Sequence, residues 1–471
     1  MMSTYIGKKG YTIYKKNYTK NEIEKVKEEL TFKPFHIKGY GPESKPFSVY
    51  GNTKEKMFLP KFYGIETFGI PEECKLVEPT NISIQFNGKL RENQEEPVKK
   101  CLESANSKGG GILCLPCGYG KTSISLYLIS KLSVKTIVIV NKEFLMDQWK
   151  ERIQQFLPSA RIGILQQKKV DIEDKDIVIA MLQSIAMRDY DTSIFSTFGC
   201  SIYDEVHCVP SKIFSKALRK IHTRYHFGLS ATPNRADGMT KITKLYIGDI
   251  IYKPKKSSIK NPKNAKVIVV DNEMKDTKFY KSIKNYMGKP NVVQMISNKI
   301  QCPNRLQMIC NIIQYLIKDK RHILILSERI QYLHNINNEI QEMYKDTVPF
   351  SIGYYIGGMK KEERKRSESV DLLLASYSMA KEAMDIPILD TLVMVTSKSN
   401  IEQSVGRIMR KTEYPPERPP LIIDIVDDFS SFSSQAIRRN TFYEKKHYPV
   451  YTFPYTITIF KEIDEVKDTF I

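Results

Sequence analysis

One run of residues contains what a phosphate-binding loop needs: Leu115-Pro116-Cys117-Gly118-Tyr119-Gly120-Lys121-Thr122. Gly118 and Gly120 let backbone amides converge on phosphate oxygens. Lys121 adds a point charge, and the hydroxyl of Thr122 is a ligand for Mg²⁺. The strict pattern of such loops starts with glycine, whereas this run starts with Leu115. We predict that the run binds nucleotide phosphates through residues Pro116, Cys117, Gly118, Tyr119, Gly120, Lys121, Thr122 and Ser123.

A pair of adjacent carboxylates, Asp204 and Glu205, follows the apolar stretch that ends at Tyr203. An acid at the end of a buried strand can hold Mg²⁺, and its neighbour can orient and deprotonate a water molecule. We assign the first role to Asp204 and the second to Glu205. Two adjacent acids alone are usually surface residues. Here another strand end follows them, Ser230-Ala231-Thr232-Pro233, which favours a catalytic site.

Short apolar runs, each followed by a turn and a longer amphipathic stretch, must position these residues. Five runs lie in the first half of the chain, at 112–115, 136–140, 177–180, 200–203 and 227–230. Four more lie in the second half, at 322–327, 371–375, 392–396 and 421–425. Buried parallel strands that alternate with helices produce this pattern, so we predict an α/β fold. A helix is expected directly after the phosphate-binding run, over 123–132.

The length of 471 residues exceeds what one core usually serves. We predict four parts: an amino-terminal accessory module (1–84), a first lobe (85–251), a basic connector (252–300) and a second lobe with a tail (301–471). The connector prediction rests on residues 253–266, which include two prolines and six lysines. Such a stretch is typical of a solvated hinge, and phosphate contact is an equally good interpretation.

The charge balance favours a polyanionic partner. The 73 Lys and Arg residues against 53 Asp and Glu give a net charge of +20, which suits nucleic acid. A lysine-rich proteome is the alternative explanation. No stretch is apolar enough to span a membrane, and the amino terminus lacks the apolar core of a signal peptide. The eight cysteines are scattered, and Cys114 with Cys117 lacks the second pair of a zinc site. We therefore expect a soluble intracellular protein.

From about Leu90 to Asp424 the chain resembles superfamily 2 helicases of the XPB type. The resemblance rests on motifs in the family's order, at Leu90–Gln94, Leu115–Thr122, Asn141–Trp149, Asp176–Ser184, Asp204–His207, Gly228–Pro233, Ile323–Arg329, Ala375–Pro387 and Gln403–Arg410. It implies two RecA-like lobes with mostly parallel sheets, ATP and Mg²⁺ as cofactors, and nucleic acid bound largely without regard to its sequence. Residues 7–16 and the tail around 429–451 are similar to helicases of large cytoplasmic DNA viruses, including the poxvirus transcript-release helicase.

The resemblance also implies roles for single residues. In the first lobe, the adenine side would be formed by Arg91 and Gln94, and hydrolysis would be coupled to movement by His207, Ser230, Ala231 and Thr232. In the second lobe, Gln403, Arg407 and Arg410 would face the γ-phosphate, with Asp385 beside the same cleft. The spacing of three between the two arginines predicts that they share one helix face. Two departures from the family are the missing aromatic residue before Gln94 and Ala383 in place of a glycine.

Two groups of aromatic residues have alternative interpretations. Trp149, the sole tryptophan, could stack on a base, but an amphipathic stretch shared with Phe144 and Ile153 favours core packing. In the amino-terminal module, core packing is likewise favoured over an interaction face for Tyr11, Tyr14, Phe58, Phe62, Tyr63 and Phe68.

Three functions stay open. The first is a helicase that unwinds DNA or RNA, in viral transcription, repair or replication. The second is a double-strand translocase that releases transcripts or remodels protein–nucleic acid complexes. The third is a scaffold without ATPase activity, against which the intact Lys121, Glu205 and Arg407 argue. A viral origin would imply the host cytoplasm as location, the transcription machinery as partner, and packaging in the virion.

Overall fold

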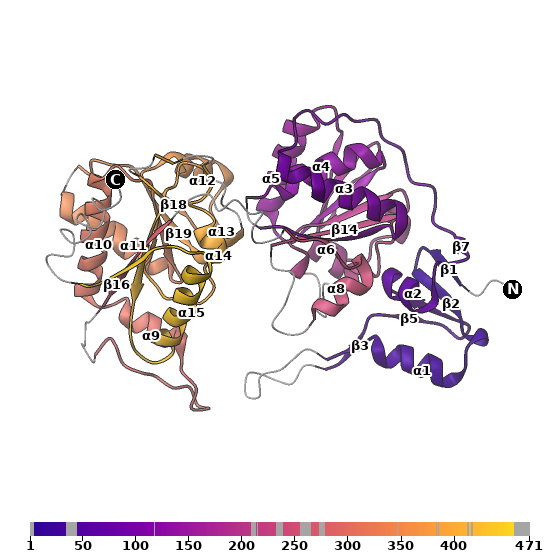
Figure 1. Ribbon diagram of the computed structural model, residues 1–471, viewed down its shortest axis with the longest axis horizontal. Coiled ribbons are helices and arrows are strands. Elements are labelled where there is room, and N and C mark those ends of the chain that lie inside the picture. The colour runs from indigo at the N-terminus through magenta and orange to yellow at the C-terminus, as the bar shows by residue number, and fades with distance from the viewer. Residues whose placement is uncertain are drawn as a thin grey trace. The chain divides into compact units, whose positions relative to one another are not determined.

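The computed structural model forms two compact units, residues 1–259 and 260–471. It describes residues 4–33, 45–116, 118–208, 213, 215–231, 239–254, 265–272, 278–345, 347–382, 384, 386–411, 414–415 and 418–455. Each unit contains its own large and mostly parallel sheet (Figure 1). Among the described residues, every helix is too short or too polar to cross a bilayer.

The sheet at the centre of the first unit has eight strands. Their order is β11 (Lys169–Asp171), β10 (Ile162–Gln166), β12 (Ile177–Met181), β9 (Thr136–Val140), β13 (Cys200–Tyr203), β14 (Tyr225–Ser230), β8 (Gly110–Cys114) and β15 (Ile250–Tyr252). Neighbouring strands run parallel, except that β11 forms an antiparallel hairpin with β10. β8, β9, β12 and β13 are buried along their whole length, as expected for strands covered on both faces.

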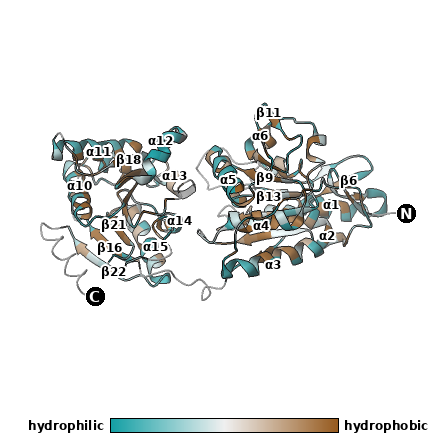
Figure 2. Ribbon diagram, turned by 90° about the horizontal axis from the view of Figure 1, so that it is seen from above, coloured by the Kyte–Doolittle hydropathy of each residue, from teal (hydrophilic) through white to brown (hydrophobic). Residues whose placement is uncertain are grey.

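Helices cover both faces of this sheet (Figure 1). One face carries α3 (Glu92–Ser107), α4 (Lys121–Leu132) and α5 (Glu143–Phe156), and the other carries α6 (Leu182–Met187) and α8 (Thr240–Ile247). A short helix, α7 (Ser215–Leu218), precedes β14. Helical spacing explains the packing of α5, because Leu145, Met146, Trp149 and Ile153 all fall on its buried side. Figure 2 shows the strands as mostly hydrophobic, while the helices carry residues of both kinds.

The amino-terminal residues of the first unit form a second, smaller sheet. Its strand order is β5 (Gly51–Asn52), β6 (Lys56–Leu59), β2 (Gly10–Tyr14), β1 (Thr4–Gly7) and β7 (Glu73–Cys74). A hairpin of β3 (Thr31–Phe32) and β4 (Phe47–Ser48) and two helices, α1 (Lys20–Glu29) and α2 (Lys61–Phe68), complete this part. Core packing is confirmed for Tyr11, Phe62 and Tyr63, which are buried.

This small sheet packs on the first lobe. The hydroxyl of Tyr246 in α8 donates a hydrogen bond to the carbonyl of Val49, at 2.5 Å. The buried Lys61 donates from Nζ to the carbonyl of Arg224, which precedes β14, at 2.7 Å. Both parts therefore share one continuous hydrophobic core.

The second unit has a seven-stranded sheet in which all strands run parallel. The order is β18 (Ile352–Tyr355), β19 (Leu372–Ser376), β17 (Ile323–Ser327), β20 (Thr391–Met394), β21 (Leu421–Val426), β16 (Lys266–Asp271) and β22 (Val450–Pro454). Its helices are α9 (Val292–Lys299), α10 (Pro303–Lys318), α11 (Ile330–Tyr344), α12 (Lys361–Arg366), α13 (Tyr377–Glu382), α14 (Glu402–Val405) and α15 (Ser431–Lys445).

The predicted fold class is confirmed, and all nine predicted strands are present, as β8, β9, β12, β13, β14, β17, β19, β20 and β21. One stretch differs from the expectation. Lysine content predicts a connector over 252–300, yet β16 within it lies between β21 and β22 in the sheet. The cause is the short apolar run from Val267 to Val270, three of whose four residues are buried between the polar ends of the strand.

Candidate nucleotide-binding site

The phosphate-binding run joins the end of β8 to the start of α4, which begins at Lys121. Gly118 and Gly120 have φ angles of +79° and +89°, in the left-handed region that favours glycine. At Gly120 a Cβ atom would also lie 2.1 Å from the side-chain nitrogen of Gln94. The backbone conformation of the loop therefore favours glycine at both positions, and the contact with Gln94 leaves no room for a side chain at Gly120. Cys117, predicted as part of the same loop, lies outside the described residues.

Two side chains from the start of α3 support this loop. The amide nitrogen of Gln94 donates to the carbonyl of Tyr119 at 2.9 Å and to the hydroxyl of Ser123 at 3.3 Å. The guanidinium of Arg91 donates to the carbonyls of Gly118 and Tyr119, at 3.2 and 2.9 Å. Sequence reasoning assigned both residues to adenine and missed these contacts. Contact with adenine stays a prediction.

Lys121 and Glu205 are brought together from the ends of β8 and β13. The Nζ atom of Lys121 lies 3.4 Å from Oε1 of Glu205. Burial disfavours the charged carboxylate, but Lys121 and His207 outweigh burial and lower the pKa of Glu205 to about 2. The backbone of Glu205 has a φ of +46°, which non-glycine residues rarely adopt. Such strained backbone persists where surrounding contacts hold it, and it concentrates at functional sites.

The neighbouring Asp204 is oriented by two hydrogen bonds. Trp149 in α5 donates from Nε1 to Oδ2 of Asp204 at 2.9 Å, and the backbone amide of Glu205 donates to Oδ1, also at 2.9 Å. Burial and the charge of Glu205 raise the pKa of Asp204 above its ordinary value. Trp149 is 1% exposed, so the core interpretation is confirmed. Its hydrogen bond to the carboxylate was not foreseen, because hydropathy spacing carries no information about an indole N–H.

His207 connects the carboxylates with the end of β14. Its Nδ1 atom lies 3.2 Å from Oε2 of Glu205 and 3.1 Å from the hydroxyl of Ser230. Burial disfavours the imidazolium, but contacts with Cys208 and Glu205 raise the pKa of His207 to about 9. Ser230 is fully buried, and Ala231 follows it. Thr232, predicted to act with them, lies outside the described residues.

Gln403, Arg407 and Arg410 lie in the second unit, after β20. Gln403 is in α14, and Arg407 is buried and donates to the carbonyl of Met384. The prediction that both arginines share one helix face is wrong, because α14 ends at Val405 and the chain continues as a turn. Asp385 lies outside the described residues.

Residues 87–235 match the family described as "Type III restriction enzyme, res subunit". A protein of Acanthamoeba polyphaga mimivirus that carries the name of an ATP-dependent RNA helicase is 33% identical over 463 residues. The alignment covers 95% of this chain and 86% of that protein. This chain belongs to the superfamily 2 helicases.

Two further comparisons show similarity to an archaeal protein and to a solved structure. A Sulfurisphaera tokodaii protein named as a DNA 3′-5′ translocase of the XPB type is 30% identical over 198 residues, which cover 41% of this chain and 43% of that protein. Dbp5 of S. cerevisiae, solved with RNA and ADP BeF3, has a TM-score of 0.55 and 13% identity, over 79% of this chain and 91% of that one. The last likeness shows the shared fold. The expected relationship to XPB-type and large-virus helicases is confirmed.

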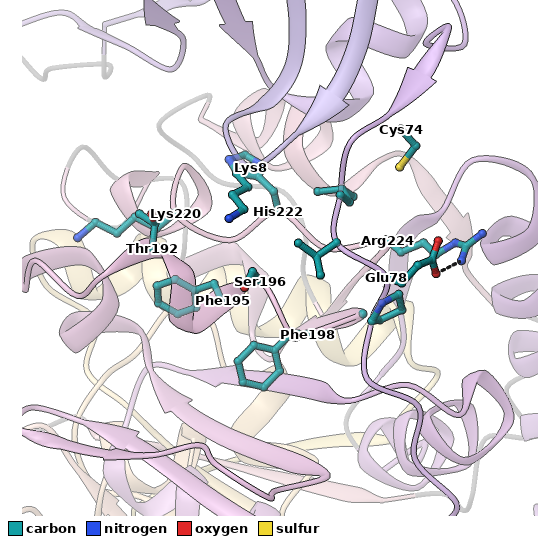
Figure 3. Close-up of a pocket in the computed structure, with 14 residues that line it drawn as sticks. Lys8, Cys74, Glu78, Thr192, Phe195, Ser196, Phe198, Lys220, His222 and Arg224 are labelled. Carbon is teal, nitrogen blue, oxygen red and sulfur yellow. Dashed lines mark ion pairs between the residues drawn. The ribbon is translucent and has the colours of Figure 1, made fainter.

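A cavity of about 110 Å³ lies at the other edge of the helicase's first sheet (Figure 3). It is lined by Lys8 of the amino-terminal sheet and by residues that precede β13 and β14, such as Gly199 and Arg224. Arg224 forms an ion pair with Glu78 at 3.8 Å. Nucleotides bind at the carboxyl edge of parallel strands, so this cavity is distinct from the ATP site.

Proposed function

We propose that this helicase hydrolyses ATP with Lys121, Asp204 and Glu205 and converts the energy into movement along nucleic acid. One observation chiefly supports these assignments: side chains at the ends of three adjacent strands meet. Lys121 follows β8, Ser230 ends β14, and Glu205 follows β13, with β14 between the other two. A cation, a carboxylate of low pKa and a histidine that contacts both Glu205 and Ser230 suit the cleavage of a phosphate bond.

Mg²⁺ would be held by the hydroxyl of Thr122 and the carboxylate of Asp204. Both are oxygen donors, which Mg²⁺ prefers, and Mg²⁺ typically takes its remaining ligands from water and substrate phosphates. The hydrogen bonds from Trp149 and from the amide of Glu205 fix the carboxylate in advance. When bound, the ion would neutralise charge on the phosphates. Glu205 would orient the attacking water and accept its proton, while His207 would hold Glu205 in place.

The other motif residues are proposed in their predicted roles. Phosphates would meet the loop from Pro116 to Gly120, including Cys117 and Tyr119, and Ser123. Adenine would lie near Arg91 and Gln94. Coupling to movement would involve His207, Ser230, Ala231 and Thr232, and the γ-phosphate side of the second lobe would comprise Gln403, Arg407, Arg410 and Asp385.

The substrate would be nucleic acid, since a net charge of +20 suits a polyanion. The mimivirus relative is named for RNA and the archaeal relative for DNA, so both substrates are candidates. The mimivirus relative is a viral protein, and we propose a role in viral transcription, repair or replication, with transcription machinery as partner, the host cytoplasm as location and packaging in the virion. The parts 1–84, 85–251, 252–300 and 301–471 are proposed as functional divisions.

ATP hydrolysis measured with single- and double-stranded DNA and RNA, beside strand displacement, tests the proposal. Stimulation with displacement supports a helicase, and stimulation without displacement supports a double-strand translocase that releases transcripts or remodels complexes. Binding without hydrolysis would leave only the scaffold.

Glu205→Gln tests the assigned base in the same assays. The variant should bind ATP normally and lose at least about 100-fold in turnover, the scale of general-base catalysis. Glu103→Gln is a matched control, because Glu103 is an exposed acid of α3 paired with Lys100. It should hydrolyse ATP like the wild type. Normal turnover in Glu205→Gln would remove Glu205 from the assigned role.

A further inference from the structure

A tight hairpin projects from the second unit between β16 and α9. Lys284 pairs with Pro290 in an antiparallel bridge, and the amide of Asn285 donates to the carbonyl of Lys289 at 2.7 Å. The side-chain oxygen of Asn285 accepts from the amides of Met287 and Lys289, each at 3.0 Å. Figure 1 shows the segment before α9 as an extended loop. The turn therefore has a defined backbone and holds Tyr286 at its tip.

Tyr286 is 91% exposed, and no large hydrophobic side chain of the described residues is more exposed. The adjacent Met287 is 37% exposed. A tyrosine ring normally buries much of its area, because removing apolar surface from water stabilises a fold. A rigid turn that holds a ring in solvent thus presents a surface suited to a ligand with a flat face.

The surroundings of the ring are cationic. From residue 278 to residue 318 the sequence contains no aspartate or glutamate. Lys278, Lys281 and Lys284 are exposed along the first arm of the loop. An aromatic ring beside lysines, without acids, matches the chemistry of single-stranded nucleic acid, in which bases stack and phosphates need counter-charges. A protein partner fits this surface less well, because protein interfaces have an apolar core of several side chains and the hairpin presents a single ring.

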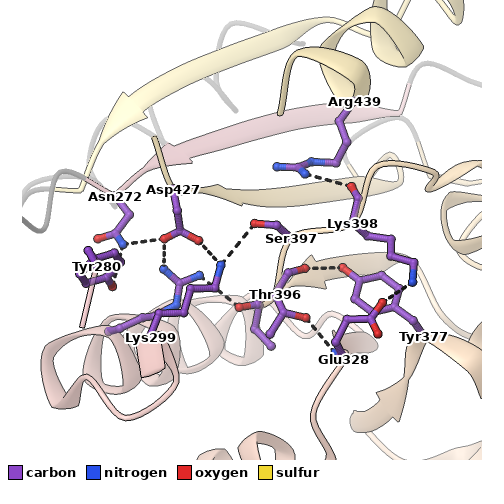
Figure 4. A network of polar contacts seen from close by, with 12 residues as sticks. Asn272, Tyr280, Lys299, Glu328, Tyr377, Thr396, Ser397, Lys398, Asp427 and Arg439 are labelled. Carbon is purple, nitrogen blue, oxygen red and sulfur yellow. Dashed lines mark hydrogen bonds and ion pairs between the residues drawn. The ribbon is translucent and has the colours of Figure 1, made fainter. Parts of the chain in front are cut away.

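The base of the hairpin is fastened to the carboxyl edge of the sheet. Asn272, directly after β16, donates from its side chain to the hydroxyl of Tyr280 and to Oδ1 of Asp427, both at 2.9 Å (Figure 4). Asp427 is fully buried and also pairs with Lys299 and Arg305. Tyr280, which precedes the hairpin, is thus hydrogen-bonded to a residue that contacts a buried ionic cluster.

We propose that the hairpin of residues 284–290 is a nucleic-acid contact, in which the ring of Tyr286 stacks on an unpaired base and neighbouring lysines neutralise the flanking phosphates. The inference rests on the proposed function, since it requires that the protein act on nucleic acid. It adds a contact outside the helicase motifs. It also assigns to the second unit a side chain that distinguishes single strands from the interior of a duplex, where both faces of every base are stacked on neighbouring bases.

Equilibrium binding of Tyr286→Ala to single-stranded DNA and RNA tests the contact. Stacking of one base predicts a loss of about 5- to 150-fold, and Tyr286→Phe should restore affinity because it keeps the ring. The slope of log affinity against log salt concentration should stay unchanged in Tyr286→Ala, since no phosphate contact is lost, but fall in magnitude by about 0.7 in Lys284→Ala. An oligonucleotide with abasic sites should bind wild type and Tyr286→Ala equally. Comparing the loss of affinity for single-stranded DNA with the loss for single-stranded RNA identifies the nucleic acid on which the ring stacks.

Ile437→Ala is the matched control, because Ile437 is 66% exposed on α15 of the same unit. It should bind like the wild type. All variants should keep the wild-type melting temperature and basal ATPase rate, since Tyr286 belongs to none of the motifs assigned to the nucleotide site. If the wild type binds no nucleic acid, the proposed function fails. If the wild type binds nucleic acid and Tyr286→Ala binds single-stranded DNA and RNA with wild-type affinity, the hairpin contact alone is overturned.

Discussion

Replacing Trp149 by phenylalanine should slow ATP hydrolysis although the indole is buried in the core. The ring is 1% exposed, and its single polar atom donates to Oδ2 of Asp204 at 2.9 Å. Phenylalanine keeps an aromatic side chain in the core and removes this donor. Asp204 then retains one of the two hydrogen bonds that orient it, the one from the amide of Glu205.

The size of the effect follows from the charge on the acceptor. A hydrogen bond to a charged group contributes about 1.5–3 kcal/mol. If the whole loss appears in the hydrolytic step or in Mg²⁺ binding, it corresponds to a factor of roughly 10 to 150. The direction is fixed by the pKa of Asp204, which burial and Glu205 raise and the Trp149 hydrogen bond lowers. Loss of the donor raises this pKa further and weakens the carboxylate as a ligand.

Steady-state hydrolysis as a function of Mg²⁺ concentration separates this effect from a packing defect. Trp149→Phe should need more Mg²⁺ and reach a lower kcat, and the smaller ring should also reduce stability by roughly 1–3 kcal/mol. Phe227→Leu is the matched control, because Phe227 is a buried ring of the same core on β14. It should lose stability and keep the Mg²⁺ dependence. A folded Trp149→Phe protein with wild-type kcat and Mg²⁺ dependence would refute the assigned role of the indole.

Three other outcomes are expected. Arg407→Lys should lower kcat at saturating nucleic acid by at least about tenfold with less effect on ATP affinity, because a planar guanidinium suits the transition state better; equal rates would contradict this. Affinity for single strands should fall by about a thousandfold or more between roughly 50 and 200 mM salt, and a flat titration would exclude a phosphate-dominated interface. Burial lowers the pKa of Lys61 to about 8. Between pH 8 and the unfolded pKa of about 10.5, the unfolded chain binds more protons than the folded chain, so the folded state becomes more stable as pH rises. Chemical denaturation should therefore show the free energy of unfolding of the wild type increasing by roughly 2–3 kcal/mol relative to that of Lys61→Met between pH 8 and pH 10.

The sequence predicts the strands of both sheets well because parallel strands covered on both faces must be apolar throughout. The run from Thr136 to Val140 is buried at every position, and the run from Leu372 to Ser376 shows the same burial. Strands that are not buried on both faces lack a continuous apolar run, and the sequence does not predict them. β10 alternates between buried and half-buried residues, and β16 lies within a lysine-rich stretch.

Motif spacing identifies the residues at the nucleotide site, but hydrogen-bond partners depend on how separate elements meet. Gln94 and Tyr119 are 25 positions apart, and their contact arises because α3 packs beside α4. The same limit applies to Arg407 and Arg410. A spacing of three indicates one face only while the chain is helical, and the helix ends at Val405.

The geometry of the first lobe suggests how a change at the phosphate reaches the rest of the sheet. Glu205 and Ser230 share one imidazole nitrogen of His207, so a shift of the carboxylate alters the hydrogen bond to the end of β14. The carbonyl of Ser230 in turn accepts from the amide of Leu115, at 2.9 Å, where the phosphate-binding run begins. With the contact between Lys121 and Glu205, these bonds close a ring across three adjacent strands. We propose that movement of one of these side chains shifts the others, so that the end of β14 responds when a nucleotide occupies the loop.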